Sequence, residues 1–264
     1  MDYTPTPAAP TSLCVTVDDP ALQQKGESLA DRLNLNFAGQ TDCCTTDLVL
    51  FYTREGLKLG HFVKDKLKPL VFIDFITGKK GFRHVKNYTI SQPLARAVGV
   101  KPGYRPRILD ATAGLGADGF ALAVLGCSVT LFERNPVLYE LLKDGLERAG
   151  KQPESAAIIA EKVQLIQTDI ITSHESLNGL FDTVYLDPMY PHRNSSALNK
   201  QVMRILRLLV GDDEDSHRLF YAARTLAPAR IAVKRPKGAP CIADLRPDHQ
   251  VKMKSGRFDI YFKK

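Results

Sequence analysis

The 264-residue sequence lacks the marks of several protein classes. No stretch reaches the roughly 18 uncharged apolar residues of a membrane-spanning helix. The N-terminus carries an acid and prolines where a secretory signal needs basic residues and then an apolar run. The five cysteines form no C-x-x-C pair and the histidines lack ligand spacing, which argues against a disulfide framework and a zinc site. We therefore expect a soluble, unprocessed, cytoplasmic protein that contacts no membrane and holds no metal.

The composition is that of an ordinary globular protein, with 44% hydrophobic and 25% charged residues. Lys and Arg number 36 against 29 Asp and Glu, which gives a formal charge of +7. This balance favours contact with polyanions such as nucleic acid. It does not establish such contact, because many soluble enzymes are mildly basic.

The first 100 residues predict a small α+β domain. Short β-type runs at 13–17, 48–52 and 70–75 are separated by polar and glycine-containing segments. Residues 101–106 have the composition of a linker, and the pattern changes behind them. We therefore place one domain at 1–100, which could capture RNA, and a second domain at 101–264.

In the second domain, short apolar strands alternate with amphipathic helices, which is typical of an α/β fold with a parallel sheet. Asn135 and Pro136 predict the start of the helix after the second strand. Two segments around Ser255 and Gly256 predict a closing hairpin with an antiparallel edge. The predicted parallel strands are 108–109, 129–132, 163–166, 183–186 and 231–233.

The segment 110–119 lies where the first parallel strand turns into its helix. Gly114, Gly116 and Gly119 match G-x-G-x-x-G, and Glu133 follows about 20 residues later at the end of the next strand. Such a loop brings backbone N–H groups close to a nucleotide. The motif alone does not separate NAD from S-adenosylmethionine.

Two further acids favour S-adenosylmethionine. Asp110 stands just before the loop, where a carboxylate suits a cationic ligand better than a pyrophosphate. Asp169 ends the third strand and is placed to accept a hydrogen bond from an adenine amino group, while Glu133 binds both ribose hydroxyls for either ligand.

A stiff loop, Asp187-Pro188-Met189-Tyr190-Pro191, follows the strand at 183–186 and reaches the same edge of the sheet. The exocyclic amine of a nucleobase is a poor nucleophile because its lone pair is delocalised into the ring. Asp187 and the carbonyl of Pro188 are natural acceptors for its hydrogens, and Tyr190 can stack on an extruded base. A rigid turn capped by aspartate uses the same residues, but the position after a nucleotide loop favours amine methylation.

Basic residues near these loops are candidates for RNA contact, although solvated faces carry the same residues. They are Lys79, Lys80, Arg83 and Lys86, then His192 and Arg193, and finally Lys234, Arg235 and Lys237.

At this point the sequence resembles the class I, Rossmann-like methyltransferases, and more closely the bacterial 16S ribosomal RNA (guanine-N2) methyltransferase family called RsmJ. The resemblance covers most of residues 70–262. It rests on DATAGLGADG from Asp110, LFERNP from Leu131, VYLDPMYPHR from Val184, VKRP from Val233 and GRFDIY from Gly256.

This resemblance implies a mostly parallel seven-stranded sheet and S-adenosyl-L-methionine as the methyl donor, with S-adenosyl-L-homocysteine as product. It also implies N2-methylation of guanine 1516 in 16S rRNA, presented as free RNA or within the small ribosomal subunit. Donor contacts are implied at Ala117, Asp118, Glu133, Arg134, Asp169, Ile170 and Asp187.

Rival functions stay open at this stage. An NAD-dependent oxidoreductase could use the same glycine loop and Glu133, and a non-catalytic RNA-binding assembly factor could retain the fold. Within the methyltransferases, similar loops serve adenine N6 and glutamine side chains.

Overall fold

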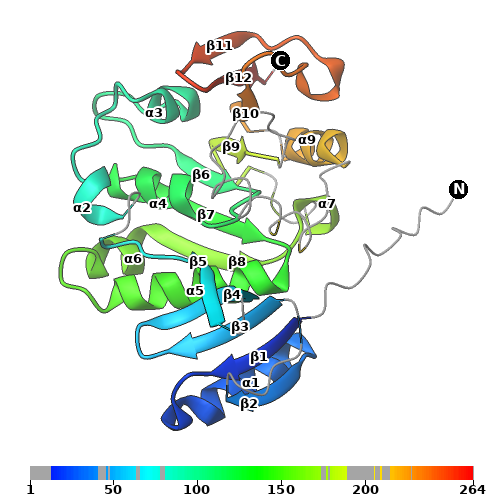
Figure 1. Cartoon of the computed structure of the whole chain (residues 1–264). Coiled ribbons are helices and arrows are strands. Elements are labelled where there is room, and N and C mark those ends of the chain that lie inside the picture. The colour runs from blue at the N-terminus through cyan, green and yellow to red at the C-terminus, as the bar shows by residue number, and fades with distance from the viewer. Residues whose placement is uncertain are drawn as a thin grey trace, which may run out of the picture. The chain divides into compact units, whose positions relative to one another are not determined.

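The structure of the chain is a computed structural model, and it divides into two compact units. One comprises residues 1–73 and 194–211, and the other comprises residues 74–193 and 212–264. Figure 1 shows their elements. The described residues are 13–40, 46, 48–63, 66–77, 81–173, 177, 179–188, 205, 209, 215–226 and 228–263.

The first unit contains a five-stranded sheet with the order β2-β1-β3-β4-β5. β1 is parallel to β2 and β3, whereas β4 and β5 continue antiparallel. The predicted strands at 13–17 and 48–52 are confirmed, and the predicted strand at 70–75 overlaps the end of β5. The elements are β1 (Leu13–Val17), η1 (Pro20–Leu22), α1 (Gln23–Leu33), β2 (Asn36–Gln40), β3 (Leu48–Thr53), β4 (Gly56–Val63) and β5 (Lys66–Phe72).

The second unit contains a seven-stranded sheet with the order β11-β12-β10-β9-β6-β7-β8. Strands β10, β9, β6, β7 and β8 run parallel, and β12 pairs antiparallel with both β10 and β11. This confirms the α/β class, the mostly parallel sheet and the antiparallel edge hairpin. The strands are β6 (Arg107–Asp110), β7 (Ser128–Glu133), β8 (Val163–Gln167), β9 (Thr183–Leu186), β10 (Arg230–Pro236), β11 (His249–Lys252) and β12 (Gly256–Phe262).

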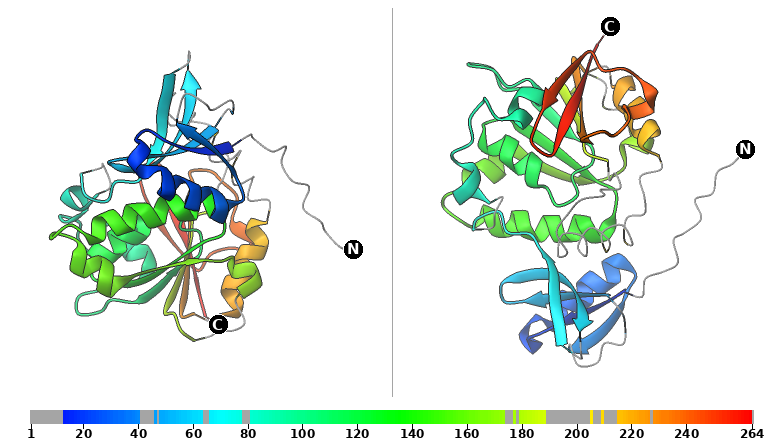
Figure 2. Two further views of the ribbon diagram at one scale, coloured as in Figure 1. Left: turned by 90° about the horizontal axis from the view of Figure 1, so that it is seen from below. Right: turned by 45° about the horizontal axis from the view of Figure 1, so that its top comes forward.

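Helices cover both faces of this sheet, as the left panel of Figure 2 shows with α4 and α5 on one side and α9 on the other. On the α9 face, Phe220 packs into a cluster with Leu109, Phe132 and Val184. The described helices of this unit are α2 (Phe82–Val85), α3 (Pro93–Val98), α4 (Ala117–Val124), α5 (Pro136–Gly150), α6 (Ala156–Lys162), α7 (Ile170–Ser173), α9 (Ser216–Thr225) and η4 (Ile242–Asp244).

The start of α5 follows the predicted cap. The side chain of Asn135 accepts hydrogen bonds from the backbone N–H groups of Val137 (3.0 Å) and Leu138 (3.1 Å), and Pro136 occupies the first helical position. Two of the N–H groups that have no partner inside the helix are thereby satisfied.

The division between the units falls after Ile73, earlier than the boundary expected after residue 100. Helix α3 belongs to the second unit because it is hydrogen-bonded to the large sheet. The carbonyl of Val98 accepts from Thr183 Oγ1 (2.9 Å), and that of Ala97 accepts from Arg230 Nη1 (3.1 Å). The linker-like residues 101–106 instead form a tight turn closed by a bridge between Lys101 and Tyr104.

At their amino ends, β6 and β9 are joined by Arg107 and Asp182. The backbone N–H of Arg107 donates to Asp182 Oδ2 (2.8 Å) and its Nη2 donates to Oδ1 (3.0 Å), while the Asp182 N–H donates to the Arg107 carbonyl (2.9 Å). This pairing precedes a register in which Asp110 lies opposite Tyr185.

Candidate active site

The carboxyl edge of the parallel sheet gathers charged residues from five neighbouring strands, since parallel strands end at the same edge. Asp110 is the last residue of β6 and Glu133 the last of β7. Asp169 follows β8, Asp187 directly follows β9, and Lys234 lies near the end of β10. The predicted nucleotide loop and catalytic loop therefore emerge at one edge, as expected.

The glycine loop turns sharply from β6 into α4. Gly116 is the N-cap of α4 with φ +71°, and a Cβ there would lie 2.4 Å from Leu142 Cδ1. A Cβ on Gly119 would lie 2.3 Å from Leu131 Cδ2. The first glycine is required by the left-handed turn and the second by the close approach of helix to strand.

Glu133 is fixed at this loop by two backbone donors. Its Oε2 accepts from the N–H of Gly114 (2.7 Å), and its Oε1 accepts from the N–H of Asn135 (2.8 Å). The residue is only 5% exposed. Charge-assisted bonds of this kind fix the orientation of the carboxylate at the end of β7, and its predicted contact with the ribose hydroxyls stays a prediction.

Asp110 is the most buried carboxyl of the edge, at 2% exposure. Burial raises its pKa well above the ordinary value, and the charges of Asp118 and Asp187 act in the same direction. A hydrogen bond from the Thr112 N–H (3.2 Å) and the charge of Lys234 oppose this shift. The surroundings of Asp110 therefore favour its protonated form more than water does.

A charge network joins α4, β9 and β10. Lys234 Nζ donates to Asp118 Oδ2 (2.7 Å) and to Asp187 Oδ2 (2.8 Å), and the hydroxyl of Tyr185 also donates to Asp118 Oδ2 (2.7 Å). Burial by itself would lower the pKa of Lys234, but the charges of Asp187 and Asp118 and their hydrogen bonds raise it. Burial and the neighbouring carboxylates raise the pKa of Tyr185, so the network consists of an ammonium, a neutral phenol and acids.

The two functional loops are hydrogen-bonded to each other. The backbone N–H of Asp187 donates to Thr112 Oγ1 (2.7 Å), which ties the start of the catalytic loop to the glycine loop. Pro188 is buried, whereas the Asp187 side chain is 40% exposed, against 24% for Asp118 and 28% for Lys234. Asp187 is thus the member of the network most accessible to a second substrate.

Arg134 connects β7 to the helices on the α9 face. Its Nη1 lies 2.6 Å from Asp215 Oδ2 and 3.4 Å from Asp169 Oδ2. Asp169 also accepts from the N–H of Ile171 (2.9 Å) at the start of α7, where Ile170 is fully buried. These contacts place Asp169 beside Arg134, the residue after Glu133, and the donor contacts predicted for Asp169, Arg134 and Ile170 stay predictions.

The remaining predicted residues lie outside the described residues or outside the charge network. Tyr190, His192 and Arg193 lie outside the described residues, as do Lys79 and Lys80. Ala117 is the first residue of α4. Arg235 is buried with its guanidinium on the Pro240 carbonyl (2.9 Å), and Lys237 is exposed.

The sequence did not identify the parts played by Thr112, Tyr185 and Lys234. In the sequence, Tyr185 is one of four residues of an apolar strand, and Lys234 is one of several basic residues that follow a predicted strand. The useful signal would have been register, because β10 extends past the end of β9 and brings Lys234 beside Asp187.

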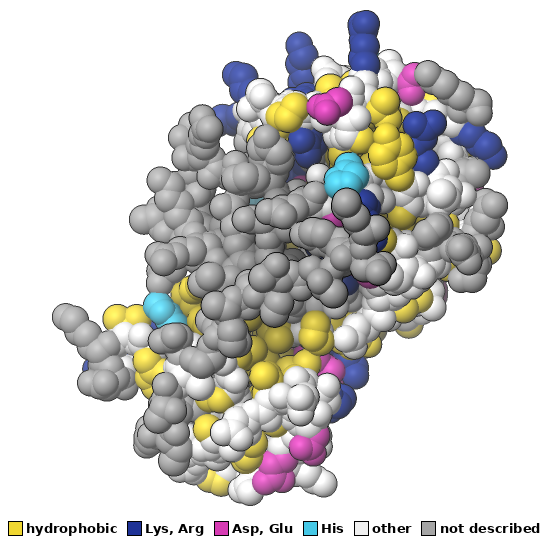
Figure 3. Space-filling view, turned by 90° about the vertical axis from the view of Figure 1, so that its right-hand side faces the viewer, with side chains coloured by type: hydrophobic (Ala, Val, Ile, Leu, Met, Phe, Trp, Pro, Cys, Tyr) yellow, Lys and Arg dark blue, Asp and Glu magenta, His cyan; other side chains and the backbone are white. Residues whose placement is uncertain are grey.

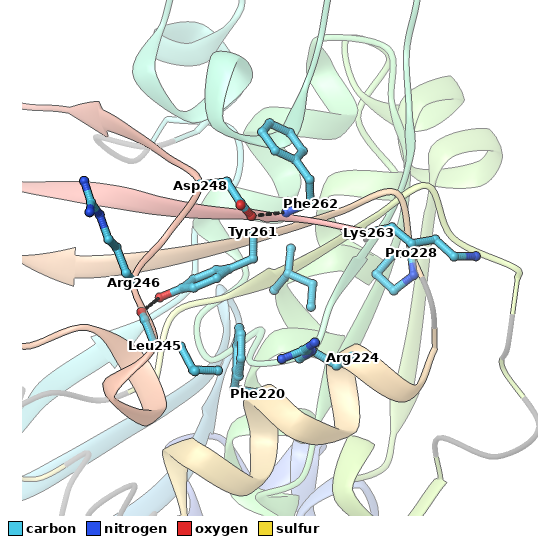
Figure 4. Close-up of a pocket in the computed structure, with 10 residues that line it drawn as sticks. Phe220, Arg224, Pro228, Leu245, Arg246, Asp248, Tyr261, Phe262 and Lys263 are labelled. Carbon is cyan, nitrogen blue, oxygen red and sulfur yellow. Dashed lines mark hydrogen bonds between the residues drawn. The ribbon is translucent and has the colours of Figure 1, made fainter.

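A separate pocket of about 280 Å³ lies at the amino end of β10 (Figure 4). The ring centroids of Phe220 and Tyr261 lie 4.7 Å apart, and the Tyr261 hydroxyl donates to the Leu245 carbonyl (2.9 Å). No predicted site residue lines it. The lining residues are Phe220, Arg224, Pro228, Ile231, Leu245, Arg246, Asp248, Tyr261, Phe262 and Lys263.

Two features are absent from the described part of the chain. None of its helices combines the length and apolar character that crossing a bilayer requires. Within the same residues, no three His, Cys, Asp or Glu side chains gather in a way that could hold a metal ion.

Comparison with known proteins gives a consistent result. The family model described as "Putative SAM-dependent methyltransferase" matches residues 28–263. The ribosomal RNA small subunit methyltransferase J of Desulfotalea psychrophila is 46% identical over 239 residues, which cover 90% of each chain. That of Thioalkalivibrio sulfidiphilus is 46% identical over 243 residues, covering 91% of this chain and 93% of its own.

A solved structure agrees with these sequence matches. The crystal structure of a SAM-dependent methyltransferase from Neisseria gonorrhoeae superposes with a TM-score of 0.72 at 30% identity. The match covers 94% of this chain and 95% of that one.

Proposed function

Because this chain belongs to the SAM-dependent methyltransferase family, together with the ribosomal RNA small subunit methyltransferases J, we propose that it methylates the exocyclic N2 of a guanine in 16S rRNA. The nucleotide would be guanine 1516 in the numbering used for the family. The family uses S-adenosyl-L-methionine as methyl donor, so the NAD-dependent and non-catalytic alternatives are not favoured.

The observation that carries this proposal is the position of Asp187. Its backbone is tied to the glycine loop through Thr112, and its partly exposed carboxylate is held by Lys234. An exocyclic amine needs two acceptors that turn its lone pair toward an electrophile. The Asp187 carboxylate and the Pro188 carbonyl are suited to this role, and Tyr190 is the proposed stacking partner for the base.

The residues of the carboxyl edge fit the donor. In this proposal Glu133 binds the ribose hydroxyls and Asp169 accepts from the adenine amino group, while the loop around Gly114 and Gly116 lies against the methionine part. When bound, the donor supplies a methyl group already activated by its sulfonium, so proximity, alignment and electrostatics are sufficient for transfer. The remaining donor contacts are proposed at Asp110, Ala117, Asp118, Arg134, Ile170 and Asp187.

An RNA partner is supported by charge. Residues 224–264 contain eleven Lys and Arg against three Asp, and Figure 3 shows dark blue side chains gathering at the end that carries β10–β12. Such a surface suits a phosphodiester backbone. Capture of rRNA by the N-terminal unit and a cytoplasmic location belong to the same proposal.

The proposal is tested with radiolabelled donor and undermethylated 16S rRNA, both free and in small subunits. Wild-type protein should label one guanine at N2, located by nuclease digestion and mass mapping, and Asp187→Ala should lose about 100-fold or more of the rate. Glu161→Ala, which removes an exposed acid of α6 outside the candidate site, serves as the matched control. No label at guanine N2, or full activity of Asp187→Ala, would contradict the proposal.

A further inference from the structure

Three carboxyl groups lie close together at the carboxyl edge of the sheet. Two of them, Asp118 and Asp187, share the Lys234 ammonium (2.7 and 2.8 Å), and the charges of both add to burial in raising the pKa of the third, Asp110. Like charges this close oppose each other's ionisation. An acid kept protonated in such a group would be a hydrogen-bond donor and could not accept the hydrogens of an amine.

Lys234 opposes this repulsion at the acid that the proposed reaction needs. Its ammonium donates to Oδ2 of Asp187 (2.8 Å) and to Oδ2 of Asp118 (2.7 Å). Asp118 is itself held by the hydroxyl of Tyr185 (2.7 Å), a strand residue with 1% exposure. Lys234 therefore links Asp187 to a rigid part of the sheet.

We infer that Lys234 is a positioning residue for the proposed methyl transfer, because its ammonium keeps the Asp187 carboxylate ionised and fixes its orientation toward the acceptor amine. This role rests on the proposed function. Lys234 acts through Asp187, while Asp187 touches the substrate. The hydrogen bond to Oδ2 restricts rotation of the carboxyl group, and Oδ1 then faces a defined direction.

Charge and packing can be separated by substitution. Lys234→Met keeps an unbranched apolar stem of similar length and removes the ammonium, and Lys234→Arg keeps a positive charge with a different geometry. The matched control is Lys151→Met, just after α5, because Lys151 is exposed and lies outside the candidate donor and RNA contacts. If Lys234→Met does not fold, Lys234→Gln provides the same comparison.

The first measurement is the pH profile of kcat with 16S rRNA. Lys234→Met should lower kcat by about 100-fold, since small misplacements at a reacting centre have effects of that size. The acid limb of its profile should move up by about 1 pH unit or more, because the cation that favoured ionisation is gone. The KM for RNA should change little, and Lys234→Arg should restore the position of the acid limb. Lys151→Met should match the wild type.

The second measurement needs no RNA. Calorimetric titrations compare S-adenosylmethionine, which carries a sulfonium, with S-adenosylhomocysteine, which does not. Removing the Lys234 ammonium makes the site more negative, so Lys234→Met should shift the preference several-fold toward the sulfonium ligand. A lysine needed only for packing would leave this ratio unchanged.

The possible failures are distinguishable. A Lys234→Met variant with kcat within two-fold of the wild type and an unshifted acid limb would overturn the role of Lys234 alone. A wild-type protein that transfers no label to rRNA would contradict the proposed function and, with it, this role.

Discussion

At the carboxyl edge of the seven-stranded sheet, Asp118, Lys234 and Asp187 form a chain of ionic hydrogen bonds, whereas at the amino end of β10 the pocket is built around the rings of Phe220 and Tyr261. The same strand, β10, supplies residues to both regions. At its start Ile231 lines the pocket, and near its end Lys234 joins the acids.

This difference shows that a pocket and the proposed reactive site can lie at opposite ends of one sheet. Two polar groups at the amino-end pocket are bonded within the protein: the Phe262 N–H donates to Asp248 (2.9 Å), and the Tyr261 hydroxyl donates to the Leu245 carbonyl (2.9 Å). The carboxyl edge instead holds acids close together and keeps Asp187 partly exposed. Chemistry is expected where charge is held under constraint.

The largest expected effect among the following variants is that of Glu133→Gln. A glutamine amide cannot accept from both Gly114 and Asn135, so the loop loses a charge-assisted bond of about 1.5–3 kcal/mol. Donor affinity should fall by about 10- to 100-fold, as measured by calorimetry. Asp248→Asn is the same change of acid to amide in the amino-end pocket and should leave affinity unchanged. Equal losses in both variants would remove the contrast between the edges.

Gly119→Ala should destabilise the fold by about 1–3 kcal/mol, because the added Cβ would lie 2.3 Å from Leu131 in a filled core. Thermal unfolding is the measurement. Gly150→Ala is the control, since its Cβ would meet Ile159 at an ordinary 3.5 Å near the end of α5. An alanine at 119 as stable as the wild type would show that the glycine loop tolerates adjustment.

Asp110→Asn should raise thermal stability at pH 8. The pKa of Asp110 is raised in the folded state, so its contribution to stability is complete below the unfolded pKa and is lost as pH rises through the folded value. Asparagine cannot ionise, and its gain over the wild type should therefore grow from pH 4 to pH 8. Melting curves across this range check the sign, and a gain that shrinks with pH would refute the assignment.

The smallest expected effect is at the amino-end pocket. Arg224→Ala combined with Arg246→Ala should change stability by no more than about 0.5 kcal/mol and leave donor affinity within two-fold. Both guanidinium groups are on exposed residues. A ten-fold loss of donor affinity would show that this pocket contributes to the donor site.

Much of the fold was predictable because buried parallel strands are short apolar runs. Strands β6 to β10 carry such runs, and the cap at Asn135 is visible in the sequence. Strand β2 was missed since Asn36–Gln40 contains glycine and polar residues and little apolar alternation. The domain boundary was expected after residue 100, and not after Ile73, because the turn at 101–106 has the same composition as a linker.

The candidate site was predictable where a residue follows directly from the end of a strand. Asp110, Glu133 and Asp187 were found in this way. The bridging role of Lys234 was not, because it depends on how far β10 extends past β9, and one strand's sequence does not contain that relation. The hydrogen bond of Tyr185 was not predicted, because a tyrosine in an apolar strand is expected to be a core residue unless the partner of its hydroxyl is known.

The pair Arg107 and Asp182 has a consequence at the other end of its strands. A slip of one residue between β6 and β9 would displace one strand by about 3.3 Å, more than the length of a hydrogen bond, and would reverse which side chains face α4. Thr112 could then no longer meet the Asp187 N–H. The Arg107–Asp182 pair, at the amino ends of these strands, thus sets the alignment of residues at their carboxyl ends. Substitutions of either residue are therefore expected to disturb the candidate site, although neither residue lies in it.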